Sequence, residues 1–175
     1  MILMESIYYI MSAEMFSFVL ENLPNEWEKD VNYNESYKLF TVNDNTEEYR
    51  TVKELFTQHA IKSIVRVQNP FQYGRFKLRQ EMCETYYVDT VYCIVHTDDL
   101  SIALKYTCDY RRYNKTAYGP NLNKQPKFYN SVSSAITNNF IDLENAKVLV
   151  LYKISGNTLT QSDYYVQYVV SLSSF

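Results

Sequence analysis

The sequence predicts an α+β fold, a class in which antiparallel strands pair without a regular crossover helix after each strand. Three observations lead to this prediction. The chain has 175 residues, 46% of them hydrophobic, which suits a single domain with its own core. Helical and strand-like periodicities are mixed in the first half, whereas strand-like segments rich in tyrosine and valine dominate from residue 86 onward. No internal repeat or low-complexity linker is visible, so we expect one domain over residues 23–175 after a lead-in helix over 1–22.

The first strand and helix of this domain are predicted from turn and cap residues. Residues 36–42 are β-prone and lead into a turn at 43–45. Thr46 is a suitable N-cap, and the two glutamates after it favour the positive end of the helix dipole. The helix then presents one apolar face. That face consists of Tyr49, Val52, Leu55 and Phe56.

The second strand and helix are predicted with sharper boundaries. Residues 61–68 alternate as a strand does. Asn69 followed by Pro70 is typical of a helix start, because proline has no orphan N–H to satisfy. We expect this helix to extend to about residue 85. Its expected buried residues are Phe71, Leu78 and Met82, and its expected solvated residues are Arg75, Lys77 and Arg79.

The second half of the chain mixes strands with short helices. Periodicity and the content of β-branched residues distinguish the two kinds of element. The predicted strands cover 88–95, 147–154 and 164–172, and the predicted helices cover 100–107 and 131–140. Because helices do not follow every strand, we expect the strands to pair antiparallel.

Composition and charge narrow the functional classes. The formal net charge of −3 gives the whole molecule no attraction for nucleic acid or anionic lipid. Cys83, Cys93 and Cys108 have no metal-ligand spacing, and their odd number favours a reducing intracellular location, cytoplasmic or nuclear. The apolar stretch over 1–20 contains two glutamates and no basic leader, so we expect neither a signal peptide nor a membrane span there.

Three segments of the first half match, in order and spacing, the motifs of one known family. They are Leu-Pro-Asn-Glu-Trp at 23–27, Glu-Tyr-Arg-Thr-Val-Lys-Glu-Leu-Phe at 48–56 and Arg-Val-Gln-Asn at 66–69. On these motifs the chain resembles the catalytic domain of the poly(ADP-ribose) polymerase family. Further along, Cys-Asp-Tyr-Arg at 108–111 and Lys-Val-Leu-Val at 147–150 resemble motifs of its mono-ADP-ribosylating, zinc-finger-associated branch.

The resemblance extends over roughly residues 23–170 and implies a fold, a co-substrate and an activity. The implied fold is of the diphtheria-toxin-like ADP-ribosyltransferase type, with split antiparallel β-sheets, flanking helices and no helical regulatory subdomain. The implied co-substrate is NAD, with no metal. The implied activity is transfer of a single ADP-ribose with release of nicotinamide, to a protein acceptor in preference to a nucleic acid.

The resemblance also assigns roles to the residues of a nicotinamide pocket. His96 stands where the family has the histidine that orients the ribose. Thr97 stands where the family has a glycine whose backbone grips the nicotinamide amide. Tyr129 and Phe140, eleven residues further on, would sandwich the nicotinamide ring. Thr137, eight residues beyond the same tyrosine, would hold the amide with its hydroxyl.

The catalytic set implied by the resemblance is His96, Tyr129 and a third position near the C-terminal strand. In one register Asp163 takes that position, which is glutamate in chain-forming polymerases. In a second register residues 162–168 form the last strand and the position is vacant. Tyr118, which begins a Tyr-Gly pair of the family, is also assigned to cofactor binding, and an insertion follows this pair.

Two functions follow from the sequence. The first is an NAD-dependent mono-ADP-ribosyltransferase, which is a glycosyltransferase. The alternative is a catalytically inactive polymerase-like domain, a pseudoenzyme that serves as a binding or scaffold module. Thr97 in the place of a glycine and the presence of only 3 glycines in the chain favour this alternative. The second histidine, His59, follows a helix end and is expected to be structural.

Overall fold

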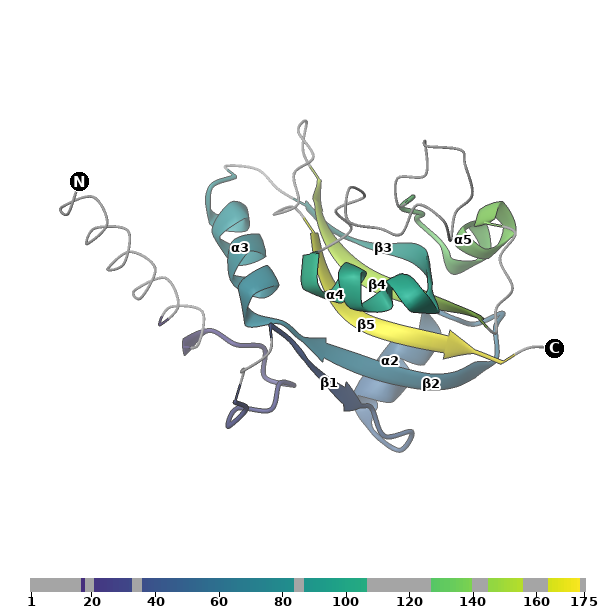
Figure 1. The fold of residues 1–175 in the computed structure, drawn as a ribbon, viewed down its shortest axis with the longest axis horizontal. Coiled ribbons are helices and arrows are strands. Elements are labelled where there is room, and N and C mark those ends of the chain that lie inside the picture. The colour runs from purple at the N-terminus through teal and green to yellow at the C-terminus, as the bar shows by residue number, and fades with distance from the viewer. Residues whose placement is uncertain are drawn as a thin grey trace.

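The computed structural model describes residue 17 and residues 21–32, 36–83, 87–106, 127–139, 145–155 and 164–173. In these ranges the chain forms an α+β fold with a five-stranded antiparallel sheet and four helices, as the sequence predicts (Figure 1). The strands are β1 (Lys38–Thr41), β2 (Ile61–Gln68), β3 (Tyr87–His96), β4 (Ala146–Ser155) and β5 (Tyr164–Leu172). The helices are α2 (Glu47–Glu54), α3 (Pro70–Glu81), α4 (Leu100–Tyr106) and α5 (Val132–Asn139), and η1 (Thr97–Asp99) is a short 3-10 turn.

The strand order of the sheet is β1-β2-β5-β4-β3, and every neighbouring pair is antiparallel. The last strand, β5, therefore lies at the centre of the sheet, between β2 and β4. The β3–β4 ladder has a continuous register from Tyr87 opposite Ser155 to His96 opposite Ala146. Side chains along β3 consequently alternate between the two faces without interruption.

The predicted boundaries agree closely with the structure. β2 and β5 have the predicted bounds, and β1, β3, β4, α4 and α5 differ from theirs by at most two residues at either end. Thr46 caps α2 by accepting the N–H of Tyr49 at 3.2 Å. Asn69 caps α3 by accepting the N–H of Gln72 at 3.0 Å. Side-chain oxygens at these two positions satisfy helix donors that would otherwise be orphaned.

Most of the predicted lead-in helix over 1–22 lies outside the described residues. Ser17 and Glu21 are described and helical, and the Ser17 hydroxyl donates to the Glu21 carboxylate at 3.1 Å. Within the described ranges, no helix is long and apolar enough to cross a membrane. In the same part of the chain, no group of three or more His, Cys, Asp or Glu side chains could hold a metal ion.

Two hydrophobic clusters cover the two faces of the sheet. On one face, here called the α2–α5 face, strand residues pack against Val52 of α2 and Ala135 of α5. On the other, the α4 face, they pack against Ala103 and Leu104 of α4. The strand residues of the α2–α5 face include Tyr92, Ile94, Ala146, Val148, Val150, Tyr168 and Val170, and those of the α4 face include Val91, Cys93, Val95, Leu149, Leu151, Val166 and Val169. In Figure 1, α4 lies in front of the sheet and α2 behind it.

A third cluster joins the N-terminal segment to α3 at one end of the sheet. Its buried members are Trp27, Phe76, Ile154 and Tyr165. The ring of Tyr73 lies 5.4 Å from the ring of Trp27 and 5.4 Å from that of Tyr165, measured between centroids. The Tyr73 phenol also donates to the carbonyl of Asn22 at 3.1 Å. The Leu-Pro-Asn-Glu-Trp motif thus anchors the start of the domain to α3.

The predicted buried face of α3 is wrong. Phe71 is 52% exposed and Met82 is 76% exposed. The buried residues of α3 are Pro70, Gln72, Gly74 and Phe76. Hydrogen bonding explains the difference, because the Gln72 amide donates to the Leu104 carbonyl at 2.6 Å and accepts the Val166 N–H at 3.4 Å. These backbone groups need partners inside the protein, and that need outweighs the apolar pattern of the helix.

Three smaller expectations about helix faces also need correction. α3 ends at Glu81, several residues before residue 85. Its cations Arg75, Lys77 and Arg79, expected to be solvated, are partly buried. Leu55, expected on the apolar face of α2, is 39% exposed and is the C-cap residue that follows the helix.

Candidate functional site

His96 is the last residue of β3, and η1 follows it directly. Its imidazole is 31% exposed and belongs, by strand alternation, to the α2–α5 face. Its Nδ1 accepts the N–H of Asp98 at 3.3 Å. Nδ1 also lies 3.3 Å from the Asp98 carboxylate, a contact that requires a proton on this nitrogen. Whichever ring nitrogen carries the proton, Nε2 is the atom that His96 can offer to a ligand hydroxyl.

Thr97 is exposed and its polar groups are engaged locally. Its hydroxyl donates to the Asn145 carbonyl at 2.9 Å, which ties η1 to the start of β4. Its carbonyl accepts the backbone N–H of Leu100 within η1. The backbone that the resemblance assigns to the nicotinamide amide is therefore already part of a turn.

Tyr129 is attached to the strand that carries His96. Its backbone pairs with that of Tyr92 in an isolated antiparallel bridge, with N–H···O distances of 2.8 and 2.9 Å. Its side chain is partly buried and packs against the cluster of the α2–α5 face. Its hydroxyl is buried and has no hydrogen-bond partner within the described chain.

His96 and Tyr129 thus belong to the same face and the same edge of the sheet, but they are not in contact. Tyr129 lies opposite Tyr92, and His96 is four residues further along β3. At about 3.3 Å per residue, this offset corresponds to about 13 Å along the strand. The structure brings the two candidates to one side of the molecule, with several residues of strand between them.

Of the other predicted pocket residues beyond η1, the structure describes Thr137 alone. Thr137 is exposed on α5, whose inward residues Ala135 and Ile136 contact the core. Tyr118, Phe140 and Asp163 lie outside the described residues.

The start of β5 bears on the third catalytic position. Tyr164, which follows Asp163, pairs with Lys153 of β4, whereas His96 pairs with Ala146. Lys153 is seven positions beyond Ala146 along β4, which corresponds to about 23 Å of strand. The first described residue of β5 therefore lies at the opposite end of the sheet from His96.

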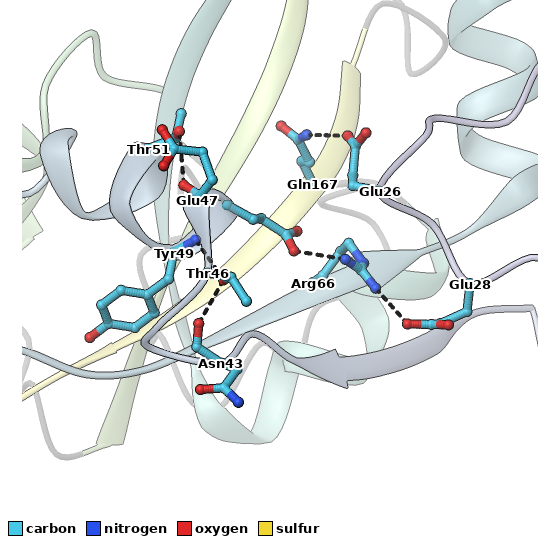
Figure 2. A network of polar contacts seen from close by, with 10 residues as sticks. Glu26, Glu28, Asn43, Thr46, Glu47, Tyr49, Thr51, Arg66 and Gln167 are labelled. Atoms are coloured by element: carbon cyan, nitrogen blue, oxygen red, sulfur yellow. Dashed lines mark hydrogen bonds and ion pairs between the residues drawn. The ribbon is translucent and has the colours of Figure 1, made fainter.

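The Arg-Val-Gln-Asn motif contributes to a buried polar network, part of which Figure 2 shows. The guanidinium of Arg66 is 8% exposed and lies 2.8 Å from the Glu48 carboxylate and 3.3 Å from that of Glu28. The Gln167 amide faces Glu26 at 3.5 Å. These contacts connect β2, α2 and β5 to the N-terminal segment that carries Trp27.

Asn69, the last residue of that motif, has a second structural role besides its cap. Its amide donates to the Leu104 carbonyl at 2.9 Å, beside the Gln72 amide that bonds the same oxygen. Both side chains are buried, at 1% exposure each. The Asn69 side chain therefore links the start of α3 to the last turn of α4, and both its amide nitrogen and its amide oxygen are hydrogen-bonded within the protein.

Buried tyrosines lie beside the network. Burial raises the pKa of Tyr165 well above the ordinary value for a phenol. Burial and the nearby Glu48 carboxylate together raise the pKa of Tyr168. Both phenols therefore stay protonated at neutral pH and can only donate or accept hydrogen bonds there.

His59, expected to be structural, lies at a cavity that no sequence pattern indicates. Its Nε2 is 3.3 Å from the Ser133 hydroxyl, across 74 positions of the chain. The cavity has a volume of about 260 Å³ and lies between the end of α2 and the start of α5. The residues around His59 come together only through the tertiary contact between α2 and α5, so local sequence patterns could not predict this cavity.

No protein-family model matches the chain, and a search of curated proteins finds no match. Membership of the polymerase family therefore remains a prediction that depends on the motifs.

Proposed function

We propose that this chain is an NAD-dependent ADP-ribosyltransferase of the polymerase type, which transfers a single ADP-ribose to a protein acceptor and releases nicotinamide. The α+β class and the antiparallel sheet are compatible with this proposal. Its finer architecture would be the split-sheet form of that fold, with flanking helices and without a helical regulatory subdomain.

The observation that carries the proposal is the bridge between Tyr92 and Tyr129. Through it, the tyrosine assigned to ring stacking is fixed to the strand that ends in His96, with both side chains on the α2–α5 face. In this assignment the Nε2–H of His96 donates to a ribose hydroxyl, and the ring of Tyr129 lies against the nicotinamide. The resemblance assigns Thr137 and Phe140 to the same nicotinamide pocket, and it assigns Thr97 and Tyr118 to cofactor binding as well.

The chemistry required of such a site is modest. The bond between the ribose C1′ and the nicotinamide nitrogen breaks, and its electron pair leaves with nicotinamide, which becomes neutral. A lone pair of the acceptor forms the new bond to C1′, and the acceptor proton passes to water. Fixed dipoles and hydrogen bonds that stabilise the cationic ribose in the transition state supply most of the acceleration in reactions of this kind.

Transfer of one unit, without chain growth, fits the third catalytic position better. Asp163 is shorter than the glutamate of chain-forming enzymes, and in the other register this position is vacant. Either register deprives the 2′-hydroxyl of the group that would activate it for elongation.

The test is incorporation of labelled NAD into the chain itself and into added acceptor protein. We expect His96→Ala, which removes a hydrogen bond to the ribose, and Tyr129→Ala, which removes the stacked ring, each to lower incorporation by about tenfold or more. Tyr129→Phe is the matched control, because it keeps the ring and removes only a hydroxyl that has no partner within the described chain. Thermal unfolding of each variant separates lost catalysis from lost fold. Absence of label with the wild-type chain would contradict the proposal.

A second candidate, a catalytically inactive binding or scaffold module, is favoured by the state of Thr97 and Thr137. The Thr97 hydroxyl is bonded to the Asn145 carbonyl, its own carbonyl is bonded within the turn, and Thr137 is exposed. A titration with NAD and with a nicotinamide mimic, followed by thermal shift, distinguishes the candidates. A pseudoenzyme predicts no shift at millimolar ligand or a shift without label incorporation, whereas a transferase predicts both.

A further inference from the structure

A cavity of about 260 Å³ lies between the C-terminal end of α2 and the first turn of α5. The loop after α2 contributes Thr57, Gln58 and His59, α5 and the residues before it contribute Asn130 and Ser133, and β3 contributes Tyr92. None of the pocket residues assigned by the family resemblance is among those that line it. The cavity is thus a separate feature of the α2–α5 face.

A chain of hydrogen bonds runs along its wall. The Ser133 hydroxyl donates to Oε1 of Gln58 at 3.3 Å and lies 3.3 Å from Nε2 of His59. A hydroxyl has one proton, so when Ser133 donates to Gln58 it must accept from the Nε2–H of His59. His59 is then not a base for Ser133, which argues against a serine nucleophile here. The arrangement leaves the amide N–H groups of Gln58 free to donate to another partner.

Tyr92 supplies a second donor from a fixed position. It is 5% exposed, its ring meets that of Phe56 edge-on with centroids 6.0 Å apart, and its backbone is held by Tyr129. Its phenol has no hydrogen-bond partner in the described chain. Burial raises its pKa, so the phenol is a proton donor at neutral pH. Tyr92 lines the cavity, so its phenol can donate a hydrogen bond to a ligand or water there.

The backbone adds donors but few acceptors. In α5 the Ser131 hydroxyl accepts the N–H of Ser134 and the Ser131 carbonyl accepts that of Ala135. The N–H groups of the first two residues, Val132 and Ser133, have no such partner within the described chain, as is usual for the start of a helix. At the end of α2, by contrast, the carbonyls of residues 52 and 53 are occupied by the N–H groups of residues 55 and 56. No carboxylate lines the cavity.

We propose that this cavity binds a small oxyanion, a phosphate or carboxylate group, between Tyr92, Gln58 and the first turn of α5. The Tyr92 phenol, the Gln58 amide and the N–H groups at the start of α5 offer several donors to one acceptor group, and no carboxylate lines the cavity to repel an anion. His59 holds Ser133 in place through its Nε2. This site does not rest on the proposed transferase activity, since it shares no residue with that pocket.

The experiment titrates the full chain with inorganic phosphate, and separately with acetate, at constant ionic strength set by chloride. We expect saturable thermal stabilisation by one of the two, and the tighter one identifies phosphate or carboxylate as the group recognised. Tyr92→Phe and Gln58→Ala should each weaken binding by about tenfold, the scale of one hydrogen bond to an anion. Tyr129→Phe, which removes a buried hydroxyl that does not line the cavity, should leave the affinity unchanged.

Three results would overturn the oxyanion site. The first is stabilisation by phosphate and acetate that does not saturate above the chloride control. The second is an equal loss of anion affinity in Tyr92→Phe and Tyr129→Phe. The third is tighter binding of neutral ribose than of either anion. Because Tyr92→Phe keeps the ring and its packing, lost binding in that variant cannot be attributed to lost fold. None of these measurements depends on NAD turnover, so the oxyanion site and the transferase can fail separately.

Discussion

Two regions of this molecule contain the motifs of the family resemblance, and they use their polar side chains in opposite ways. In the motif region, residues 48–72, Arg66, Asn69 and Gln72 are buried and bonded to other parts of the protein. In the pocket region, residues 96–106 and 127–139, Thr97 and Thr137 are exposed, and the buried Tyr129 hydroxyl has no partner within the described chain.

This difference shows that the best-matched residues are explained by folding alone. A guanidinium and two amides that complete backbone and carboxylate contacts would be needed in an active enzyme and in an inactive relative alike. The motif region therefore stabilises the fold whether or not the chain is active, whereas the proposed transferase activity would depend on the pocket region. Experiments that separate the two regions are the most informative.

The largest expected effect is that of Arg66→Ala in the motif region. Removing the guanidinium leaves the partly buried Glu48 carboxylate without its partner, and breaking a buried pair in this way costs about 3 kcal/mol or more. Urea unfolding measures this change in the free energy of unfolding. The matched control is Arg50→Ala, whose bond to Glu47 joins side chains that are 64% and 82% exposed. That variant should change stability by less than about 0.5 kcal/mol, and equal losses in both would contradict a buried network.

The next effect compares one helix cap from each region. Asn69→Ala removes the cap of α3 and the amide bond to the Leu104 carbonyl, so we expect a loss of about 2 kcal/mol. Ser131→Ala removes an exposed cap of α5, which accepts the N–H of Ser134 at 3.2 Å, and should cost about 1 kcal/mol. Chemical denaturation of both variants tests the difference. A larger loss for the serine variant would reverse the comparison.

The last expected effect is a dependence of stability on alkaline pH. The pKa values of Tyr165 and Tyr168 are raised in the folded state, so above about pH 10 the unfolded chain loses these protons first. Their contribution is complete below pH 10 and declines above it, by at most about 1.4 kcal/mol per pH unit for each phenol. Denaturant midpoints between pH 9 and 11 measure the slope. Tyr168→Phe should flatten it and Tyr87→Phe, at a residue 78% exposed, should not.

Local patterns were sufficient to predict most of the fold. β2 and β5 have strong β-branched alternation, and the caps at Thr46 and Asn69 have side-chain oxygens at the helix start. Both kinds of signal lie within a few residues of the element that they define, so tertiary structure hardly alters them.

The buried face of α3 and the contents of the cavity could not be predicted in this way. Gln72 is buried because the Leu104 carbonyl and the Val166 N–H need partners, and both come from distant parts of the chain. His59 and Ser133 meet only after α2 and α5 pack on the same face. The pocket assignments at Tyr118, Phe140 and Asp163 stay predictions, since these residues lie outside the described ranges.

The central position of β5 has a consequence for the time at which this domain can fold. Its neighbours β2 and β4 both precede it in the chain, and they do not pair with each other. During synthesis, the β1–β2 and β3–β4 ladders therefore cannot join into one sheet until residues 164–172 have left the ribosome and inserted between β2 and β4. Folding should be late and cooperative, and nascent chains that stall before this segment should expose strand edges that chaperones recognise.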